Sequence, residues 1–263
     1  TRTELAIMRE SAGEMADRIG PGCLLIEFGS GSSTKTRLLL DELRDPAAYV
    51  PIDISKEHLM RSAADLSAAY PALEVIPVCA DYTADYDLPK PRRATERRVV
   101  YFPGSTIGNF HRARAIEFLE HVREVCGANG GVLIGVDLKK DRETLERAYN
   151  DAKGITADFN LNLLERINRE LRSDFDLRLF RHRAVYHEGA GRIEMYLVSL
   201  ADQTVELDGE PISFEKGEGI RTECSYKYDL EEFRDLVWEA GFRVDDVWTD
   251  PEARFSVQYL SVV

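Results

Sequence analysis

Between residues 23 and 138 the chain alternates short apolar runs with helical stretches, and this rhythm recurs five times. Each apolar run is short enough for a buried strand, and the segments between the runs have a helical period. Because neighbouring parallel strands can be joined only by crossovers, the pattern predicts an α/β fold with a doubly wound parallel sheet. The apolar runs lie at 23–28, 47–55, 73–82, 97–109 and 130–138. In such sheets, ligands bind outside the carboxyl ends of the strands.

The rhythm stops after Leu138, where a long charged helical region occupies residues 141–172. Hairpin-like strands are expected at 178–188, 191–200 and 203–214. We therefore predict that residues 140–227 form an inserted α+β domain, whereas 1–139 and 228–263 form the core of the fold. The final part of the core is expected to be a helix at 228–242 and an edge strand at 255–263.

The composition excludes several classes of protein. The net charge of -13 argues against a nucleic-acid partner, because neutralisation of phosphates supplies most of that affinity. No apolar run approaches the roughly 20 residues that a membrane-spanning helix requires, so no membrane partner is expected. The four cysteines have no CxxC spacing, which favours reduced thiols and a cytoplasmic location. The five histidines have neither HxH nor HExxH spacing, and we expect no metal.

The most specific local feature is the loop EFGSGSS, in which Gly29 and Gly31 follow an apolar run directly. Glycines at this place let the backbone turn tightly and approach a ligand, although the full GxGxxG signature is not met. Asp53 and Asp81 end the next two runs, where carboxylates can bind the ribose hydroxyls and the adenine amine. Either acid alone could instead cap a helix. Together with the glycines, they favour an adenosine site.

The motif IEFGSG, followed by DIS and CADY, resembles class I S-adenosylmethionine-dependent methyltransferases. The motifs PGSTIGNF, RIEMYLVS and TECSYKY are similar to the histidine Nα-methyltransferases of ergothioneine biosynthesis, and the similarity extends along essentially the whole chain. The resemblance implies a Rossmann-like methyltransferase sheet with an inserted substrate-binding domain, S-adenosyl-L-methionine as cofactor and L-histidine as substrate. In that family, an N-terminal segment precedes TRTE and contributes a tyrosine to the amino-acid site, so we expect such a segment before residue 1.

The resemblance also implies which residues form the site. The residues implied to hold S-adenosylmethionine are Gly29, Lys35, Asp53, Asp81 and Tyr82. Those implied to hold the α-carboxylate and amine region of the substrate are Asn109 and Tyr149. Glu223 and Ser225 are implied to bind the imidazole, with Met195 lining the pocket. No catalytic residue or general base is assigned, because methyl transfer chiefly requires alignment of a neutral amine and exclusion of water.

The chemistry of these residue types agrees with the implied roles without requiring them. A carboxylate at Glu223 can accept from one ring nitrogen while the Ser225 hydroxyl serves the other, and residues two apart on a strand share a face. An exposed strand would give the same alternation, a turn would explain Asn109, and packing would explain Tyr149 and Met195. These structural interpretations stay open on the sequence alone.

The leading hypothesis is therefore a monomeric enzyme that methylates the α-amine of L-histidine, up to the trimethylated betaine hercynine. One alternative keeps the reaction and changes the amino acid, for example to tryptophan. The other, from a different class, is a noncatalytic S-adenosylmethionine-binding module.

Overall fold

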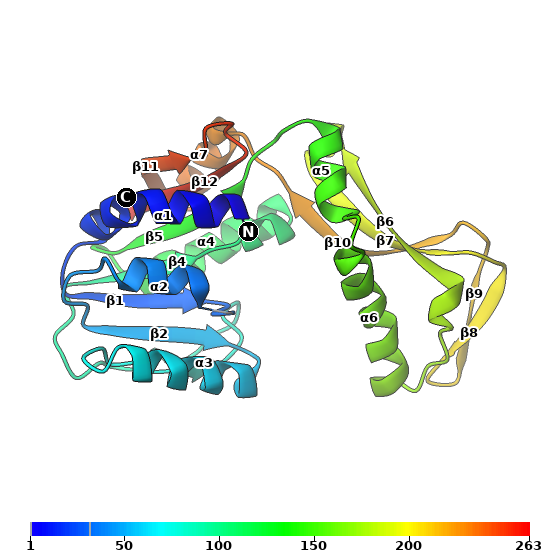
Figure 1. Cartoon of the computed structure of the whole chain (residues 1–263), viewed down its shortest axis with the longest axis horizontal. Helices are drawn as coiled ribbons and strands as arrows, with labels where there is room; N and C mark the ends of the chain where they lie inside the picture. Colours follow the sequence, from blue (N-terminus) through cyan, green and yellow to red (C-terminus); the bar gives the residue numbers. More distant parts are fainter. Residues whose placement is uncertain (1, 32) are drawn as a thin grey trace. The chain divides into compact units, whose positions relative to one another are not determined.

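The computed structural model describes residues 2–31 and 33–263 (Figure 1). The chain divides into two compact units, one formed by residues 2–138 together with Tyr228–Val263 and the other by Lys139–Lys227. No helix within the described residues is long and apolar enough to span a membrane.

The first unit is built on a sheet with the strand order β11-β12-β5-β4-β1-β2-β3. The parallel strands are β1 (Cys23–Phe28), β2 (Ala48–Asp53), β3 (Val78–Cys79), β4 (Arg97–Phe102) and β5 (Gly131–Asp137). The antiparallel strands are β11 (Phe242–Thr249) and β12 (Phe255–Val262). The strand order reverses between β1 and β4, so the loops after these strands lie at the switch point where ligands of such sheets bind. The predicted α/β class with a parallel central sheet is confirmed.

The predicted edge position of the final strand is wrong. β12 lies between β5 and β11, and the outer strand is β11, which the sequence interpretation did not include. The β11 segment carries Arg243, Asp245 and Asp246, and its register with β12 shifts between Val244 and Asp246. Because an outer strand with a bulge is partly solvated, it lacks the apolar run that marks the inner strands.

The helices of the first unit cover both faces of the sheet (Figure 1). They are α1 (Arg2–Ile19), α2 (Thr34–Leu40), α3 (Lys56–Ala69), α4 (Arg112–Cys126), α7 (Leu230–Glu239) and the 3-10 turn η1 (Thr106–Asn109). α1, α2 and α3 contribute to one apolar cluster with the strands, whereas α4 packs on β4, β5 and α7. At the start of α7, Asp229 and Glu232 form a capping box that fixes where the helix begins.

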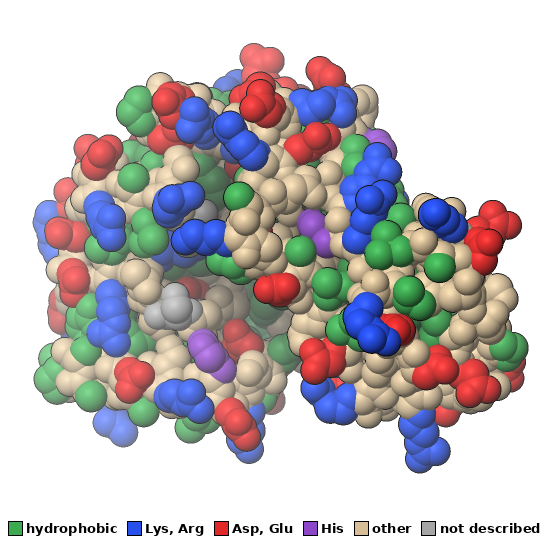
Figure 2. All heavy atoms as spheres, turned by 45° about the vertical axis from the view of Figure 1, so that its right-hand side comes forward, with side chains coloured by type: hydrophobic (Ala, Val, Ile, Leu, Met, Phe, Trp, Pro, Cys, Tyr) green, Lys and Arg blue, Asp and Glu red, His purple; other side chains and the backbone are tan. Residues whose placement is uncertain are grey.

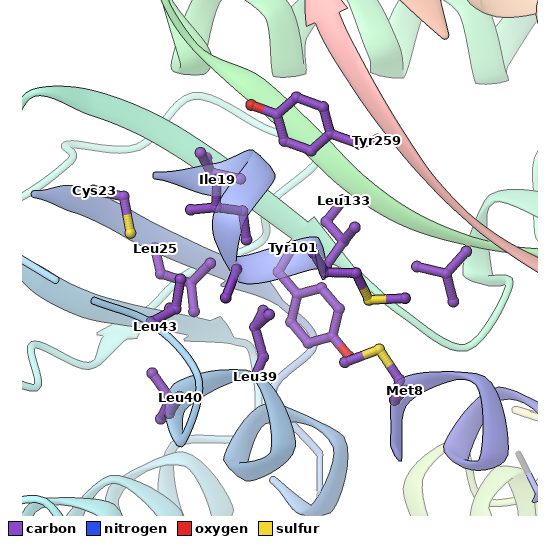
Figure 3. Packing of buried hydrophobic residues seen from close by; sticks show 14 of the residues in the cluster. Met8, Ile19, Cys23, Leu25, Leu39, Leu40, Leu43, Tyr101, Leu133 and Tyr259 are labelled. Carbon is purple, nitrogen blue, oxygen red and sulfur yellow. The ribbon is translucent and has the colours of Figure 1, made fainter. Parts of the chain in front are cut away.

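Figure 3 shows how the cluster on the α1 side of the sheet is packed. Met8 and Ile19 from α1 meet Leu39 from α2 and Tyr101 from β4, and all four side chains are buried. The Tyr101 hydroxyl lies 3.9 Å from the Met8 sulfur. This packing holds the N-terminal helix against the strands whose ends carry the candidate site.

The second unit combines two helices with antiparallel strands. Its helices are α5 (Arg142–Tyr149) and α6 (Ile155–Glu170), and its strands are β6 (Phe180–His187), β7 (Arg192–Ser199), β8 (Gln203–Leu207), β9 (Glu210–Phe214) and β10 (Gly219–Tyr226). Short 3-10 turns lie at η2 (Leu177–Leu179) and η3 (Glu188–Ala190). The order β10-β7-β6 forms one sheet, and β8 pairs with β9 as a hairpin. The predicted helical region is interrupted at Gly154, whose φ of 73° ends the continuity between α5 and α6.

Candidate active site

The loop after β1 has the backbone that its glycines predict. Gly29 and Gly31 have φ angles of 73° and 42°, values that L side chains rarely adopt. The Gly29 amide donates to the Ile52 carbonyl at 2.9 Å, which ties the loop to the end of β2. Both glycines are exposed, so the backbone at this strand end is open to close approach by a ligand.

The acid that precedes the loop is part of the buried framework. Glu27 is 2% exposed and accepts hydrogen bonds from the hydroxyls of Thr36, at 2.7 Å, and Tyr49. Burial raises the pKa of Glu27 to about 7, although both hydrogen bonds and the charge of Lys35 oppose this shift. Glu27 thus connects β1, α2 and β2 beneath the glycine loop.

Lys35 lies at the start of α2 and is held by an acid from α1. Its Nζ donates to Oε2 of Glu4 at 2.7 Å, and Oε1 of the same carboxylate accepts from the Gly104 amide at 2.7 Å. Gly135 makes room for this arrangement, because a Cβ there would lie 2.6 Å from the Glu4 carboxylate. Glu4 is 1% exposed and therefore fixes the lysine and the loop after β4 relative to one another.

Asp53 and Asp81 both lie at strand ends and both support local turns. Oδ1 of Asp53 accepts from the Ser55 amide at 2.8 Å, and Oδ1 of Asp81 accepts from the amide and hydroxyl of Thr83. The bonds from Thr83 lower the pKa of Asp81, so its carboxylate is charged at neutral pH. Within residues 2–31 and 33–263, the second oxygen of each carboxylate makes no hydrogen bond.

Tyr82 belongs to an aromatic group at the same strand ends. Its ring stacks on Phe28 with centroids 5.1 Å apart and an interplanar angle of 5°, and Phe102 and Phe118 meet it edge-on. Burial and the neighbouring acids Asp81 and Asp53 raise the pKa of the Tyr82 hydroxyl. Asn109 ends η1 after β4 and is exposed.

In the second unit, a β-bulge decides which face of the sheet Glu223 occupies. Arg221 pairs with Tyr196 of β7, but Glu223 pairs with Met195, so Thr222 is an extra residue. Its hydroxyl donates to the Met195 carbonyl at 3.2 Å. Because paired residues share a face, the bulge places Glu223 on the Met195 face, whereas a regular strand would place it opposite Glu194.

Ser225, two residues further, lies on the same face and meets Tyr149 of α5. The Tyr149 hydroxyl donates to Ser225 Oγ at 2.9 Å, and Nζ of Lys227 donates to both, at 2.8 Å to Tyr149 and 2.7 Å to Ser225. We call Tyr149, Ser225 and Lys227 the lysine cluster. Met195 is buried in the apolar cluster against which Tyr149 packs.

The electrostatic environment of Glu223 is set by burial and by the lysine cluster. Burial raises the pKa of its carboxyl group, and the positive charge of Lys227 opposes that shift. A carboxylate in this setting gains from a ligand that donates a hydrogen bond. The second unit therefore brings Tyr149, Met195, Glu223 and Ser225 together, and the first unit holds the other predicted site residues.

Residues 1–262 match the family model described as histidine-specific methyltransferase, SAM-dependent. The chain belongs to this family. It is 40% identical over 264 residues to the histidine N-alpha-methyltransferase of Mycolicibacterium smegmatis, covering 98% of this chain and 80% of that relative. It is 34% identical over 257 residues to ergothioneine biosynthesis protein 1 of Neurospora crassa, covering 95% of this chain and 29% of that protein.

A solved S-adenosylmethionine-dependent methyltransferase from Clostridium acetobutylicum shares the fold, with a TM-score of 0.55 and 9% identity over 98% of this chain and 91% of that one. The family resemblance seen in the motifs is thus confirmed, and the methyl donor of this histidine-specific methyltransferase is S-adenosylmethionine.

The first unit of the methyltransferase fits this donor. Two left-handed glycines leave backbone exposed after β1, and two carboxylates with a spare oxygen lie at the end of β2 and after β3. A ribose and an adenine amine present donors that such carboxylates accept. The assignment of Gly29, Lys35, Asp53, Asp81 and Tyr82 to the cofactor stays a proposal that these features support.

Sequence interpretation missed three polar residues that organise the methyltransferase site. Glu4 occupies the apolar stripe of α1 with Ile7 and Met8, and an acid on such a stripe is a detectable signal. Glu27 sits inside an apolar run. Lys227 continues the alternation of Glu223 and Ser225, but a lysine in that pattern is more often solvated.

Proposed function

We propose that this methyltransferase transfers methyl groups from S-adenosylmethionine to the α-amine of L-histidine, continuing to the trimethylated betaine hercynine in ergothioneine biosynthesis. The family membership carries the specificity for histidine. The observation that carries the chemistry is the pair Glu223 and Ser225, which lie on one face of β10 beside Tyr149 and offer complementary hydrogen-bonding groups.

The residues of the first unit are proposed to hold the donor. When bound, S-adenosylmethionine supplies a methyl group on a positively charged sulfur. Asp53 accepts from the ribose hydroxyls and Asp81 from the adenine amine, while the Tyr82 ring packs against the base. The exposed backbone at Gly29 allows S-adenosylmethionine to approach closely. Lys35, which is held by Glu4, is positioned to form an ion pair with the carboxylate of the donor.

The remaining residues are proposed to hold the amino acid. Glu223 accepts from an imidazole N–H and Ser225 serves the other ring nitrogen, with Met195 against the ring. The Asn109 amide donates to the α-carboxylate, and Tyr149 contacts the amine region. Held in this way, the neutral α-amine presents its lone pair to the methyl group, and alignment and water exclusion supply the rate enhancement.

A panel of amino acids tests the proposal. The protein, with any natural N-terminal segment retained, is assayed for kcat/KM with histidine, tryptophan and phenylalanine. We expect histidine to be preferred over phenylalanine by up to about 10⁴-fold, because an apolar side chain leaves the half-buried carboxylate of Glu223 unpaired. Glu223→Ala should remove most of this preference and leave the affinity for S-adenosylmethionine, measured by calorimetry, unchanged.

Glu210→Ala supplies the matched control, since Glu210 is an exposed acid on β9 of the same unit. It should retain the preference of the parent. If the parent turned over tryptophan faster than histidine, tryptophan would be the assigned substrate in place of histidine. If the parent bound the cofactor but methylated no amino acid, a noncatalytic module would be favoured.

Other expectations from the sequence stay proposals. They are that the enzyme is a monomer in the cytoplasm, that it binds neither nucleic acid nor a membrane, and that no metal takes part in the reaction. The thiols of Cys23 and Cys126 are buried and free, and burial raises their pKa values to about 11 and about 12, which makes them unreactive.

A further inference from the structure

Lys227 is a buried cation that none of the proposed roles uses. It follows β10 directly, is 2% exposed, and places Nζ 4.9 Å from the centre of the Tyr149 ring. Removing an ammonium group from water is costly unless its N–H groups find acceptors. Here two of those acceptors are the hydroxyl oxygens of Tyr149 and Ser225, both proposed substrate ligands.

The directions of these hydrogen bonds restrict what each hydroxyl can offer a ligand. An ammonium group only donates, so both hydroxyl oxygens accept from Lys227. Ser225 Oγ also accepts from the Tyr149 hydroxyl, and a hydroxyl oxygen has two lone pairs. Ser225 has therefore no acceptor capacity left and can only donate. Tyr149 has used its hydrogen and keeps one lone pair, so it can only accept.

Resting on the proposed function, we propose that Lys227 is a positioning residue that sets the hydrogen-bonding polarity of the amino-acid site. It makes Ser225 a donor, so the site takes a neutral imidazole with its bare nitrogen toward Ser225 and its N–H toward Glu223. It also makes Tyr149 an acceptor, which suits an N–H of the α-amine and not the α-carboxylate.

This arrangement explains how one side chain serves both ends of the substrate. Glu223 accepts and Ser225 donates, so a ring with two N–H groups or with none leaves one of the two unpaired. Without the ammonium group, one lone pair on Ser225 would be released and the hydroxyl could rotate to accept or donate. Lys227 thus supplies selectivity without contacting the imidazole.

Two analogues test this polarity directly. 3-(Pyrrol-2-yl)alanine and 3-(pyrrol-3-yl)alanine each keep an N–H at one ring nitrogen position of histidine and place a C–H at the other. Whichever nitrogen faces Glu223, one isomer removes only the acceptor that Ser225 needs. We expect the parent to prefer histidine over the better isomer by about 10- to 100-fold in kcat/KM, the effect of one unpaired hydrogen bond.

Lys227→Met should lower that ratio to about threefold or less, because Ser225 regains its freedom. Ser225→Ala should lower it similarly, and the double variant should add little, as for residues that act through one group. Lys216→Met removes an exposed lysine of the same unit and should keep the ratio of the parent. Far-UV circular dichroism and thermal unfolding report whether each variant is folded.

The outcomes separate this inference from the proposed function. If the parent does not methylate histidine, the proposed function is wrong. If it methylates histidine but turns over the better pyrrole isomer equally well, Ser225 is not a donor and the inference fails, even if Lys227→Met does not fold. A Lys227→Met protein that loses activity and keeps the ratio of the parent would show a purely structural lysine.

Discussion

Charged residues of this methyltransferase differ in role according to what surrounds them. Glu27 and Glu223 are both glutamates on strands, but Glu27 accepts hydrogen bonds from Thr36 and Tyr49, whereas the charge of Lys227 acts on Glu223. The sequence interpretation treated the acid of IEFGSG as part of a cofactor motif. The structure instead shows that Thr36 and Tyr49 donate to it, so it joins three elements.

Burial of Glu27 makes stability depend on pH. Its pKa of about 7 in the folded protein lies above the ordinary glutamate pKa of 4.5, so between these pH values the folded protein retains a proton that the unfolded chain releases. The contribution of Glu27 to the free energy of unfolding is therefore fully present below pH 4.5 and is lost as the pH rises toward 7. The loss is at most about 3 kcal/mol. Glu27→Gln cannot titrate and should remove this decline.

Denaturant unfolding from pH 5 to 8 measures the effect as the difference in pH slope between Glu27→Gln and the parent. Glu10→Gln, a change at an exposed position of α1, serves as the control and should follow the parent. Parallel pH profiles for all three proteins would mean that Glu27 does not titrate in this range.

At the scale of elements, hydrophobic periodicity in the sequence predicted the positions of the inner strands. It did not predict features that depend on how the strands pair in the fold. The inner strands β1, β4 and β5 are continuous apolar runs, which is why their positions were recognisable. In the run at 73–82, the regular pairing with β2 is confined to Val78–Cys79. The residue before this pair is Pro77, which has no N–H to donate to a neighbouring strand. A bulge such as Thr222 has no compositional mark, because it arises from how β10 pairs with β7.

The predicted site residues divide in the same way. Gly29, Asp53 and Asp81 were singled out because they lie at the ends of apolar runs, and each lies at or just after the end of a strand. Glu223 and Ser225 were suggested by family resemblance, and the bulge decides which face of β10 they share. Lys227 could not be singled out, because only the fold brings it to Tyr149.

Deletion of Thr222 tests whether the bulge sets the amino-acid site. Without the extra residue, Arg221 can still pair with Tyr196 and Glu223 with Met195, so Glu223 and Ser225 keep the Met195 face in a regular strand. We expect kcat/KM for histidine to stay within about tenfold of the parent, since neither hydrogen-bonding group changes face. Thr222→Ala loses only the bond to the Met195 carbonyl and should stay within about fivefold of the parent.

Affinity for S-adenosylhomocysteine should be unchanged in both variants, because the cofactor residues are proposed to lie in the other unit. A deletion variant that binds S-adenosylhomocysteine but loses histidine methylation would show that the bulge itself is required, beyond the pairing of Glu223 with Met195.

At the scale of the whole molecule, each of the two units has apolar clusters of its own. In the first unit one cluster joins α1, α2 and α3 to the strands, and in the second unit two clusters lie among α5, α6 and the strands of that unit. On the face drawn in Figure 2, acidic and basic side chains are interspersed, although the net charge is -13. The proposed cofactor residues belong to the first unit, and most proposed amino-acid residues belong to the second.

Hydrogen exchange should therefore report the two ligands in different parts of the chain. S-adenosylhomocysteine should slow amide exchange at 29–35, 53–55 and 81–83, and histidine should slow it at 145–149 and 223–227. A ligand at about 100 times its Kd adds about 2.7 kcal/mol to the stability of the state that binds it, so amides that exchange by opening of that site should slow by up to about 100-fold.

Asp53→Ala should weaken cofactor binding by about 1–3 kcal/mol, because it removes a charged acceptor, and should lower the cofactor protection from about 100-fold to about 20-fold or less at an unchanged cofactor concentration. If histidine binds without the cofactor, its protection at 223–227 should persist in this variant, and phenylalanine, offered as a control, should give none. Equal loss of both protections in Asp53→Ala would mean that the cofactor must bind first. Protection of 223–227 by the cofactor alone in the parent would show that the ligand assignments to the two units are wrong.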